Sequence, residues 1–394
     1  MWEGVYGRPV RSNPMTHDEH GRGAWIEIDI GNLQANFEKI RAELPARVGM
    51  LSVVKAGGYG HGAEWVARCA LDQGAFGLGV ATIGEAAPLR RAFPEARILM
   101  LANPMPEDFQ PAVELKVTLC PGQMETLERM EHFGRGRGEP LLIHLKINTG
   151  MNRYGLRWDE VESWTSRMRT FRHVRLEGVF SHFAMSDEAD KTSAILQMER
   201  FAAVLEVMKR SGLDPGLRHL CNSGGFLDLP GAHWDVVRLG LLPLGVFPSK
   251  VCRRIPGIEP VLSVKARLAA IQRIKPGETV GYGLRYTATC ERVMGIVPLG
   301  YGDGFPRVRN EGEVLVGGRR APLAGSVAMD AFAVDLTEIP EARLYDEVVV
   351  LGRQGSEEIR AEEMAALKKS VTYDLLSGWR GRLPRRLADP RTRG

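Results

Sequence analysis

The stretch GMLSVVKAGGYGHG, residues 49–62, is the part of the sequence that most clearly indicates the fold class. Its first half is a continuous apolar run, which is typical of a parallel strand covered on both faces. The run ends on Lys55, and glycines, a tyrosine and a histidine follow. Burial of an ammonium group is costly unless the group is paired, deprotonated or covalently used. The stretch therefore predicts a buried strand whose terminal lysine either reaches solvent or has a chemical role.

Comparable apolar runs recur along the chain. They lie at residues 76–81, 97–101, 117–120, 141–148, 176–183, 217–223 and 236–242. Segments with helical spacing separate most of them, for example residues 63–73 and 197–212. Strands that alternate with helices in this way predict a TIM-type (β/α)8 barrel, an α/β fold.

The pattern changes near residue 258. From there on, short strand-like pieces are punctuated by glycine and proline, and few helices are indicated, which predicts a separate, mostly β domain. We therefore expect an N-terminal arm at 1–23, the barrel at 24–257 and the C-terminal domain at 258–394. The alternating segment at 25–30 predicts a half-buried strand, and its pairing with either the barrel or the C-terminal domain is left open.

The composition excludes several classes of protein. Of 394 residues, 44% are hydrophobic and 25% are charged, and the net charge is only +4, so nothing favours a nucleic-acid partner. The five cysteines have no paired spacing, which argues against a disulfide framework or a bound metal. Residues 1–23 are polar and contain no apolar core of a signal peptide, and no uncharged run reaches the ~18 residues of a membrane span. We expect a cytoplasmic protein.

Polar residues gather at the carboxyl ends of the predicted strands, where the catalytic groups of such barrels lie. Taken singly, each has an ordinary interpretation, such as a solvated lysine, a core histidine or an interior ion pair. Their convergence on one rim favours a site. These residues are Lys55, Lys146, Arg153, His182, Asn222 and Ser223, together with Arg238, which lies within the last predicted strand.

The last two strands of the predicted barrel end in glycine-rich loops. CNSGG at 221–225 and RLGLLPLG at 238–245 offer a hydroxyl and free backbone N–H groups, as barrel phosphate sites do. A phosphate site beside a rim lysine indicates pyridoxal phosphate, with Lys55 as the lysine that binds the cofactor as an imine.

An ordered set of motifs resembles the alanine racemase family of pyridoxal-phosphate enzymes. The resemblance covers residues 25–386 approximately. The motifs are SVVKAGGYGHG, HLKINTGMNRYG, SHFAMSDE, CNSGG, VRLG, VGYGLRYTA, LGYGDGFPR and APLAGSVAMD. It implies an isomerase that interconverts L- and D-alanine, a step of D-alanine biosynthesis that supplies a cell-wall precursor.

The resemblance also implies a two-base mechanism. Lys55 would move a proton on one face of the substrate Cα, and Tyr282 would serve the opposite face from the second subunit of a homodimer. Inversion needs both faces, since a single side chain can hardly reach each side of the carbon. His182 would assist Tyr282, and Arg238 would donate to the pyridine nitrogen.

The family pattern assigns the remaining site residues. Tyr59, Ser223 and the backbone of Gly240 and Leu241 would hold the phosphate, and Arg153 would bond the phenolic oxygen. A carbamylated lysine at the position of Lys146 would hold Arg153, which also borders the substrate. Met329, contributed by the second subunit of the homodimer, would lie against the substrate carboxylate, and Tyr301 would narrow the entrance. Without the resemblance, Tyr59 reads equally as a surface residue, and Tyr301 and Met329 as packing residues of the β domain.

Several positions depart from the family pattern. Gly57 and Gly58 replace an asparagine and an alanine, Asn148 replaces an aspartate, and Ala328 replaces a cysteine. Gly381 stands where a phosphate-binding tyrosine is usual, so that contact is lost or supplied by Trp379. A wider entrance keeps open a broad-specificity racemase for serine, lysine or arginine. A non-catalytic pyridoxal-phosphate-binding protein is a further alternative because it shares the barrel, although such relatives lack the second domain.

Overall fold

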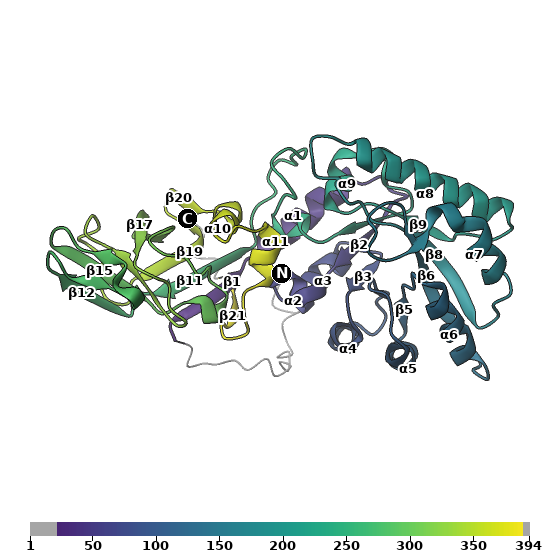
Figure 1. The fold of residues 1–394 in the computed structure, drawn as a ribbon, viewed down its shortest axis with the longest axis horizontal. Coiled ribbons are helices and arrows are strands. Elements are labelled where there is room, and N and C mark those ends of the chain that lie inside the picture. Colours follow the sequence, from purple (N-terminus) through teal and green to yellow (C-terminus); the bar gives the residue numbers. More distant parts are fainter. Residues whose placement is uncertain (1–21, 389–394) are drawn as a thin grey trace, which may run out of the picture. The chain divides into compact units, whose positions relative to one another are not determined.

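The computed structural model describes residues 22–388, which form two compact units (Figure 1). One unit is Asp29–Val261, and the other joins the residues up to Ile28 with those from Leu262 onward. The predicted N-terminal arm lies outside the described residues except for its last two positions. Within residues 22–388, no helix has the length and apolar character needed to cross a membrane.

The first unit is a barrel of eight parallel strands in the order β10-β2-β3-β4-β5-β6-β8-β9. The strands are β2 (Gly49–Val53), β3 (Gly77–Val80), β4 (Ile98–Met100), β5 (Val117–Leu119), β6 (Leu141–Asn148), β8 (Val174–Phe180), β9 (Leu217–His219) and β10 (Val236–Leu239), with a short β7 (Leu156–Arg157) beside β6. Two backbone hydrogen bonds close the ring, from Asp235 N to Arg218 O and from Arg238 N to Cys221 O, both 3.0 Å. The predicted TIM-type barrel is confirmed.

Helices follow most barrel strands. They are α1 (Ile30–Glu43), α3 (Ala63–Asp72), α4 (Ile83–Ala92), α5 (Phe109–Glu114), α6 (Met124–Gly134), α7 (Val161–Met168), α8 (Thr192–Arg210) and α9 (Ser223–Asp228). The longest, α8, buries Phe201, Val204 and Met208, whose spacing of three and four residues gives one apolar face. Burial of one face explains why helical spacing was legible in the sequence.

The barrel strands are apolar because they are covered on both faces. Every residue of β3 and of β10 is buried. Leu51, Leu99, Phe180 and Val236, from four different strands, pack in one core cluster. At the strand ends, where this core stops, polar side chains replace the apolar ones.

The second unit is mostly β structure, as predicted. Its main sheet has the order β12-β15-β18-β17-β16-β19-β11-β1-β21, with β20 beside β19, and β13 and β14 form a separate pair. The strands are β1 (Ala24–Ile28), β11 (Leu262–Arg267), β12 (Ala270–Ile274), β13 (Thr279–Val280), β14 (Tyr286–Thr287), β15 (Arg292–Val297), β16 (Glu313–Val316), β17 (Arg319–Ala324), β18 (Phe332–Asp335), β19 (Glu347–Gln354), β20 (Glu357–Ile359) and β21 (Arg385–Leu387). Two helices accompany them, α10 (Ala361–Leu367) and α11 (Thr372–Ser377).

Strand β1 pairs with this second unit. It runs antiparallel to β11, with Ala24 opposite Ala266 and Ile28 opposite Leu262. Its half-buried Glu27 forms an ion pair with Lys265 of β11, with 2.8 Å between the oxygen and the nitrogen.

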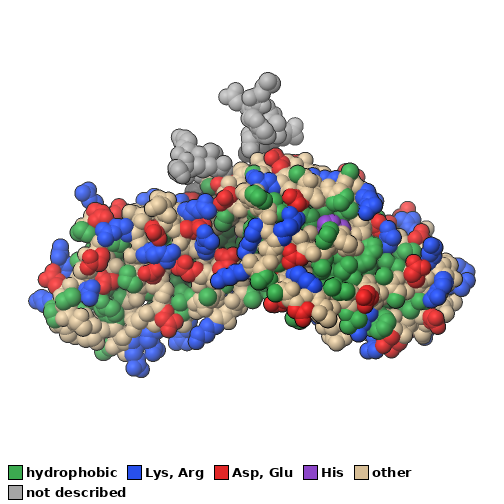
Figure 2. Space-filling model, turned by 90° about the horizontal axis from the view of Figure 1, so that it is seen from above, with side chains coloured by type: hydrophobic (Ala, Val, Ile, Leu, Met, Phe, Trp, Pro, Cys, Tyr) green, Lys and Arg blue, Asp and Glu red, His purple; other side chains and the backbone are tan. Residues whose placement is uncertain are grey.

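The face drawn in Figure 2 carries basic and acidic side chains side by side, in keeping with the net charge of +4.

Candidate active site

Lys55 stands where β2 ends and a left-handed turn begins. The turn, labelled α2 (Lys55–Tyr59), has positive φ angles from Ala56 through Gly60. Hydrogen bonds from Gly58 N to Val54 O and from Gly62 N to Gly57 O, both 2.8 Å, close it. Glycine adopts this conformation without the steric cost that a Cβ brings, which explains the glycines that follow the lysine.

Glu85 fastens this turn to the neighbouring strand. Its Oε1 accepts from Ala56 N and its Oε2 from Ala81 N, both at 2.8 Å, so one carboxylate joins the ends of β2 and β3. Sequence analysis missed Glu85. The available signal was its position three residues after Thr82, whose hydroxyl caps α4 by accepting from Glu85 N.

The charge of Lys55 is disfavoured by its surroundings. Burial lowers the pKa of its amine below the usual value, the positive charge of Arg153 lowers it further, and Glu85 opposes both. A lysine with a lowered pKa is neutral more often, and the neutral amine is the form that acts as nucleophile or base.

Lys146 is a second lysine of the site, and it is buried near the end of β6. Burial, followed by the charges of Arg153 and Arg238, lowers its pKa to about 8. Its Nζ lies 5.2 Å from the ring centroid of Tyr154 and 5.5 Å from that of Phe180. About a tenth of this amine is therefore unprotonated at pH 7, far more than for a lysine with the usual pKa of about 10.4.

Asn148 builds the loop that carries Arg153. Its Oδ1 accepts from Gly150 N at 3.1 Å and from Asn152 N at 3.0 Å, and its Nδ2 donates to Asn152 Oδ1 at 3.0 Å. These bonds hold Asn152 at a positive φ of 55°, one residue before Arg153. The side chain that replaces the family aspartate thus performs a structural task in this chain.

Arg238 is the centre of a buried chain of hydrogen bonds. Its Nη2 donates to His182 Nδ1 at 2.9 Å and to Ser181 O at 2.7 Å, and its Nη1 donates to His219 Nδ1 at 3.1 Å. A guanidinium only donates, so both imidazole Nδ1 atoms must be acceptors and each ring carries its proton on Nε2. The structure thus joins the predicted pair His182 and Arg238.

Two further histidines belong to this chain of hydrogen bonds, and the sequence analysis did not predict them. His219 and His144 are bonded through Nε2 and Nδ1 at 2.7 Å. Burial lowers the pKa of His144 to about 4, and burial lowers that of His219 and His182 well below the usual value. The signal was present in the predicted strands LLIHLKIN and LRHLCNS, where a histidine lies within a largely apolar run.

The predicted phosphate-binding residues also meet. A Cβ added at Gly240 would lie 2.7 Å from Tyr59 Oη, so only glycine permits this approach. Leu242 N lies 3.5 Å from Ser223 Oγ, which brings the loop after β10 to the start of α9. Burial raises the pKa of Tyr59 to about 12, so its phenol keeps its proton and remains a donor.

The donor set suits an anionic cofactor. The charges of Lys55, Arg153 and Arg238 all lower the pKa of Lys146, so these groups form one positive region at the barrel mouth. Within residues 22–388, the Nε of Arg238 makes no hydrogen bond and remains a donor. A phosphate, a phenolic oxygen and a ring nitrogen, as in pyridoxal phosphate, match the charge and the donors of this region.

The remaining predicted residues lie on the second unit. Tyr282 begins the short turn η5 (Tyr282–Leu284) and is 79% exposed, and Met329 is 51% exposed. Tyr301 begins the turn η6 (Tyr301–Asp303) and is half-buried. A Cβ at Gly381 would meet no atom within 4 Å, and buried Trp379 has an indole N–H without a partner in the described part of the chain.

A TIM-type barrel with a strand-end lysine in a cationic mouth, followed by a β domain, defines the class of barrel pyridoxal-phosphate enzymes. Family profiles agree: "Alanine racemase, N-terminal domain" matches residues 28–248, and "Alanine racemase, C-terminal domain" matches residues 261–387. The chain belongs to the alanine racemase family.

Individual relatives cover nearly the whole chain. It is 36% identical to an alanine racemase of Syntrophobacter fumaroxidans over 353 residues. The aligned region covers 89% of this chain and 94% of that protein. An alanine racemase of Symbiobacterium thermophilum is also 36% identical, over 92% of this chain and 97% of that protein. The solved alanine racemase of Bacillus anthracis with bound L-Ala-P is similar with a TM-score of 0.88 and 32% identity, over 94% of this chain and 96% of that one.

Proposed function

We propose that this protein is a pyridoxal-phosphate-dependent racemase that interconverts L- and D-alanine. The observation that carries the proposal is Lys55, an amine of lowered pKa at the end of a barrel strand among cationic donors. Membership of the alanine racemase family supplies the substrate. When bound, pyridoxal phosphate supplies an electron sink for the electron pair left when the Cα proton is removed.

Lys55 serves one face of the substrate. It is the residue that attaches to the cofactor, and its amine moves a proton to or from Cα. The lowered pKa supports this role because a general base must be unprotonated near the working pH. Glu85, by bonding Ala56 N, fixes the turn from which the amine projects.

Tyr282, contributed by the second subunit of a homodimer, serves the opposite face of the substrate. Its exposure supports this assignment, since a phenol 79% exposed in one chain is free to enter a partner's site. His182, with its proton on Nε2, can donate a hydrogen bond that favours the phenolate of Tyr282. Arg238 keeps its protons and would hold the pyridine nitrogen of the cofactor as a hydrogen-bond acceptor, so the electron sink that the cofactor supplies would be weaker. A weaker sink favours return of the proton to Cα.

The other site residues bind and orient. Tyr59, Ser223, Gly240 and Leu241 hold the phosphate, Arg153 the phenolic oxygen, Met329 and Tyr301 the substrate, and Lys146 holds Arg153 after carbamylation. The close contact of Tyr59 with Gly240 and the unprotonated fraction of Lys146 support these roles. The product D-alanine would serve as a cell-wall precursor in the cytoplasm.

Racemisation of alanine tests the proposal directly. Purified wild type with pyridoxal phosphate should convert L-alanine to the racemate, and chiral chromatography measures this conversion. Lys55→Ala should abolish both turnover and the visible absorption of the bound cofactor, whereas Lys275→Ala, a change of an exposed lysine on the other unit, should do neither. A wild type that bound the cofactor but left every amino acid unchanged would be a non-catalytic binding protein instead.

Deuterium exchange separates the two bases. In D₂O, wild type should incorporate deuterium at Cα from either enantiomer of alanine. Tyr282→Phe should lose exchange from one enantiomer only, because Lys55 still serves the other face. Equal loss from both enantiomers would contradict the two-base assignment.

One observation favours a second function, racemisation of larger amino acids such as serine, lysine or arginine. The space around Gly381 is open, where the family tyrosine would stand. Values of kcat/KM across a panel of amino acids decide between the two functions, because they measure discrimination in the transition state.

A further inference from the structure

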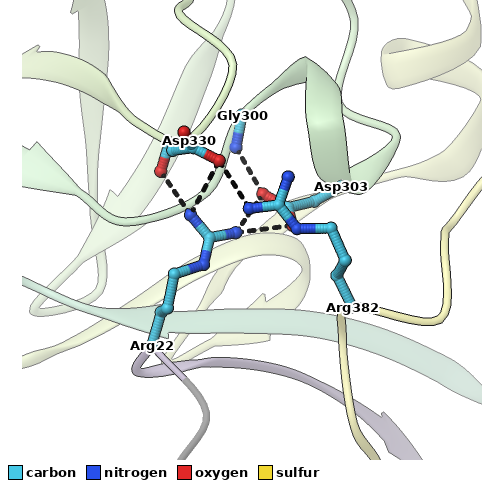
Figure 3. A network of polar contacts seen from close by, with 5 residues as sticks. All are labelled: Arg22, Gly300, Asp303, Asp330 and Arg382. Atoms are coloured by element: carbon cyan, nitrogen blue, oxygen red, sulfur yellow. Dashed lines mark hydrogen bonds and ion pairs between the residues drawn. The ribbon is translucent and has the colours of Figure 1, made fainter.

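Four charged side chains of the second unit form a closed cluster, here called the Arg–Asp cluster (Figure 3). At its centre, the carboxylate of Asp303 is fully buried. Arg22 Nη2 donates to both of its oxygens, at 2.6 and 2.8 Å, and Gly300 N donates to Oδ2 at 2.9 Å. Arg382 Nε lies 3.4 Å from Oδ1 of the same carboxylate.

Asp330 completes the cluster, since the same two arginines bind it. Arg382 Nη2 donates to its Oδ1 at 2.5 Å. Arg22 Nη1 donates to its backbone oxygen at 3.0 Å and lies 3.4 Å from Oδ1. The hydrogen bond from Arg382 is the main reason that the pKa of the Asp330 carboxyl lies below its usual range, and the positive charges of Arg382 and Arg22 lower it further. Each arginine therefore bridges both aspartates.

The two aspartates lie on the loops that carry Tyr301 and Met329. Asp303 is the last residue of η6, which Tyr301 begins, and Asp330 directly follows Met329. Backbone bonds already join the loops, from Tyr301 N to Ala328 O at 3.1 Å and from Gly302 N to Met329 O at 2.9 Å. The cluster adds a charged fastening to this contact.

The fastening comes from both ends of the chain. Arg22 precedes β1 and Arg382 precedes β21, strands that lie side by side in the sheet. Arg380 N also donates to Asp303 O at 3.0 Å, so the C-terminal segment docks on the η6 loop. The sheet edge formed by β1 and β21 thus fixes where both guanidinium groups stand.

We propose that Arg22 and Arg382 are positioning residues that set substrate selectivity by holding the Tyr301 loop against the Met329 loop. This inference rests on the proposed function, in which Tyr301 and Met329 border the substrate. Loss of either arginine leaves two carboxylates with one shared counter-charge, so the loops separate and the entrance widens. A wider entrance weakens binding of alanine, the smallest substrate of the panel, and admits larger amino acids.

The exposure of the four side chains separates positioning from folding. Asp303 is fully buried, so removal of Arg22, its bidentate partner, also strands a buried charge and lowers stability. Arg382 and Asp330 are 41% and 58% exposed, and ion pairs at such exposure contribute little to stability. Arg382→Gln is therefore the cleaner substitution, and Arg22→Gln the supporting one.

The experiment compares steady-state kinetics of wild type, Arg382→Gln and Arg382→Lys on L-alanine and L-serine. In Arg382→Gln, KM for L-alanine should rise about tenfold while kcat changes by less than about twofold, because only the positioning of substrate is altered. The ratio of kcat/KM for serine over alanine should rise, and Arg382→Lys should recover part of the loss. Arg273→Gln is the matched control. Arg273 lies on β12 with an exposed side chain that pairs with Glu291 at 3.1 Å, and its removal should change neither KM nor kcat.

The outcomes distinguish failure of the proposed function from failure of the positioning role of the two arginines. A wild type inactive on every amino acid refutes the proposed function. An active wild type whose Arg382→Gln and Arg22→Gln variants fold, by circular dichroism, and keep both KM and the serine-to-alanine ratio refutes the positioning role. A uniform fall in kcat for both substrates, without a change in KM, refutes it equally.

Discussion

Lys55 follows β2 and Lys146 lies near the end of β6, two strands of the same barrel that are not neighbours, and the surroundings of the two amines differ. The pKa of Lys55 is lowered by burial and by Arg153, but the carboxylate of Glu85 raises it. Around Lys146, burial and three cations lower the pKa, and only the Cys120 thiol opposes them. Lys146 is thus the lysine whose charge the fold tolerates least, and a negative group attached to its amine would remove the conflict with Arg153.

We predict that Lys146 is carbamylated. Its neutral amine attacks CO₂, forming an N–C bond and releasing one proton, so the reaction needs the unprotonated form. With a pKa of about 8, that form grows as the pH rises through 8, and the carbamate should grow with it. Carbon-13 NMR in labelled bicarbonate should show one carbamate signal that Lys146→Gln removes and Lys275→Gln keeps. Absence of the signal at pH about 9, above that pKa, would refute the prediction.

Asn148 offers a prediction on the Arg153 loop. Asn148→Ala removes all three bonds that shape the loop and should weaken pyridoxal-phosphate binding about tenfold, an expected loss of about 1.4 kcal/mol. Asn148→Asp retains the two accepting bonds and adds an attraction for Arg153, so it should bind the cofactor at least as well. Fluorescence titration of the apoprotein measures both. Equal binding by Asn148→Ala and wild type would contradict the role assigned to the loop.

At the scale of elements, the site depends on how the turn after β2 meets the loop after β10. Gly240 lies against Tyr59 so closely that any Cβ would overlap its ring and hydroxyl. Gly240→Ala should therefore displace Tyr59 and raise the Kd for pyridoxal phosphate, with a smaller effect on the affinity for alanine once the cofactor is saturating. Gly138→Ala, where a Cβ meets open space, is the matched control. Unchanged cofactor affinity in Gly240→Ala would show that Tyr59 has no part in the phosphate site.

At the scale of the whole molecule, the buried histidines make the barrel sensitive to acid. Burial lowers the pKa of His144 to about 4 and lowers those of His182 and His219 well below 6.5. The unfolded chain takes up these protons at higher pH than the folded barrel does, so their contribution is complete above pH 6.5 and is lost as the pH falls toward 4.

Unfolding monitored by circular dichroism should therefore show falling stability between pH 6.5 and about 4, with a smaller slope in His144→Gln. The substitution removes one of the protons that the chain takes up when it unfolds in this pH range. The same slope in His144→Gln and in wild type would contradict the assignment of a neutral, buried His144.

The sequence by itself determined the fold class and the rim position of the site. Continuous apolar runs separated by amphipathic helices indicate parallel strands, because strands covered on both faces leave no alternation. Carboxyl ends of parallel strands share one rim, so Lys55 and His182 could be placed together from strand ends, with Arg238 in the last strand. Local pattern suffices where burial and direction act residue by residue.

Tertiary structure alone decided the contacts between strands. Glu85, His219 and His144 escaped sequence analysis, because their roles depend on atoms brought within about 3 Å from distant segments. The Arg–Asp cluster joins residues 22, 303, 330 and 382, and no local pattern marks such a pairing. Hydrogen bonds and ion pairs require exact distances in three dimensions, and those distances exist only once the sheets have formed.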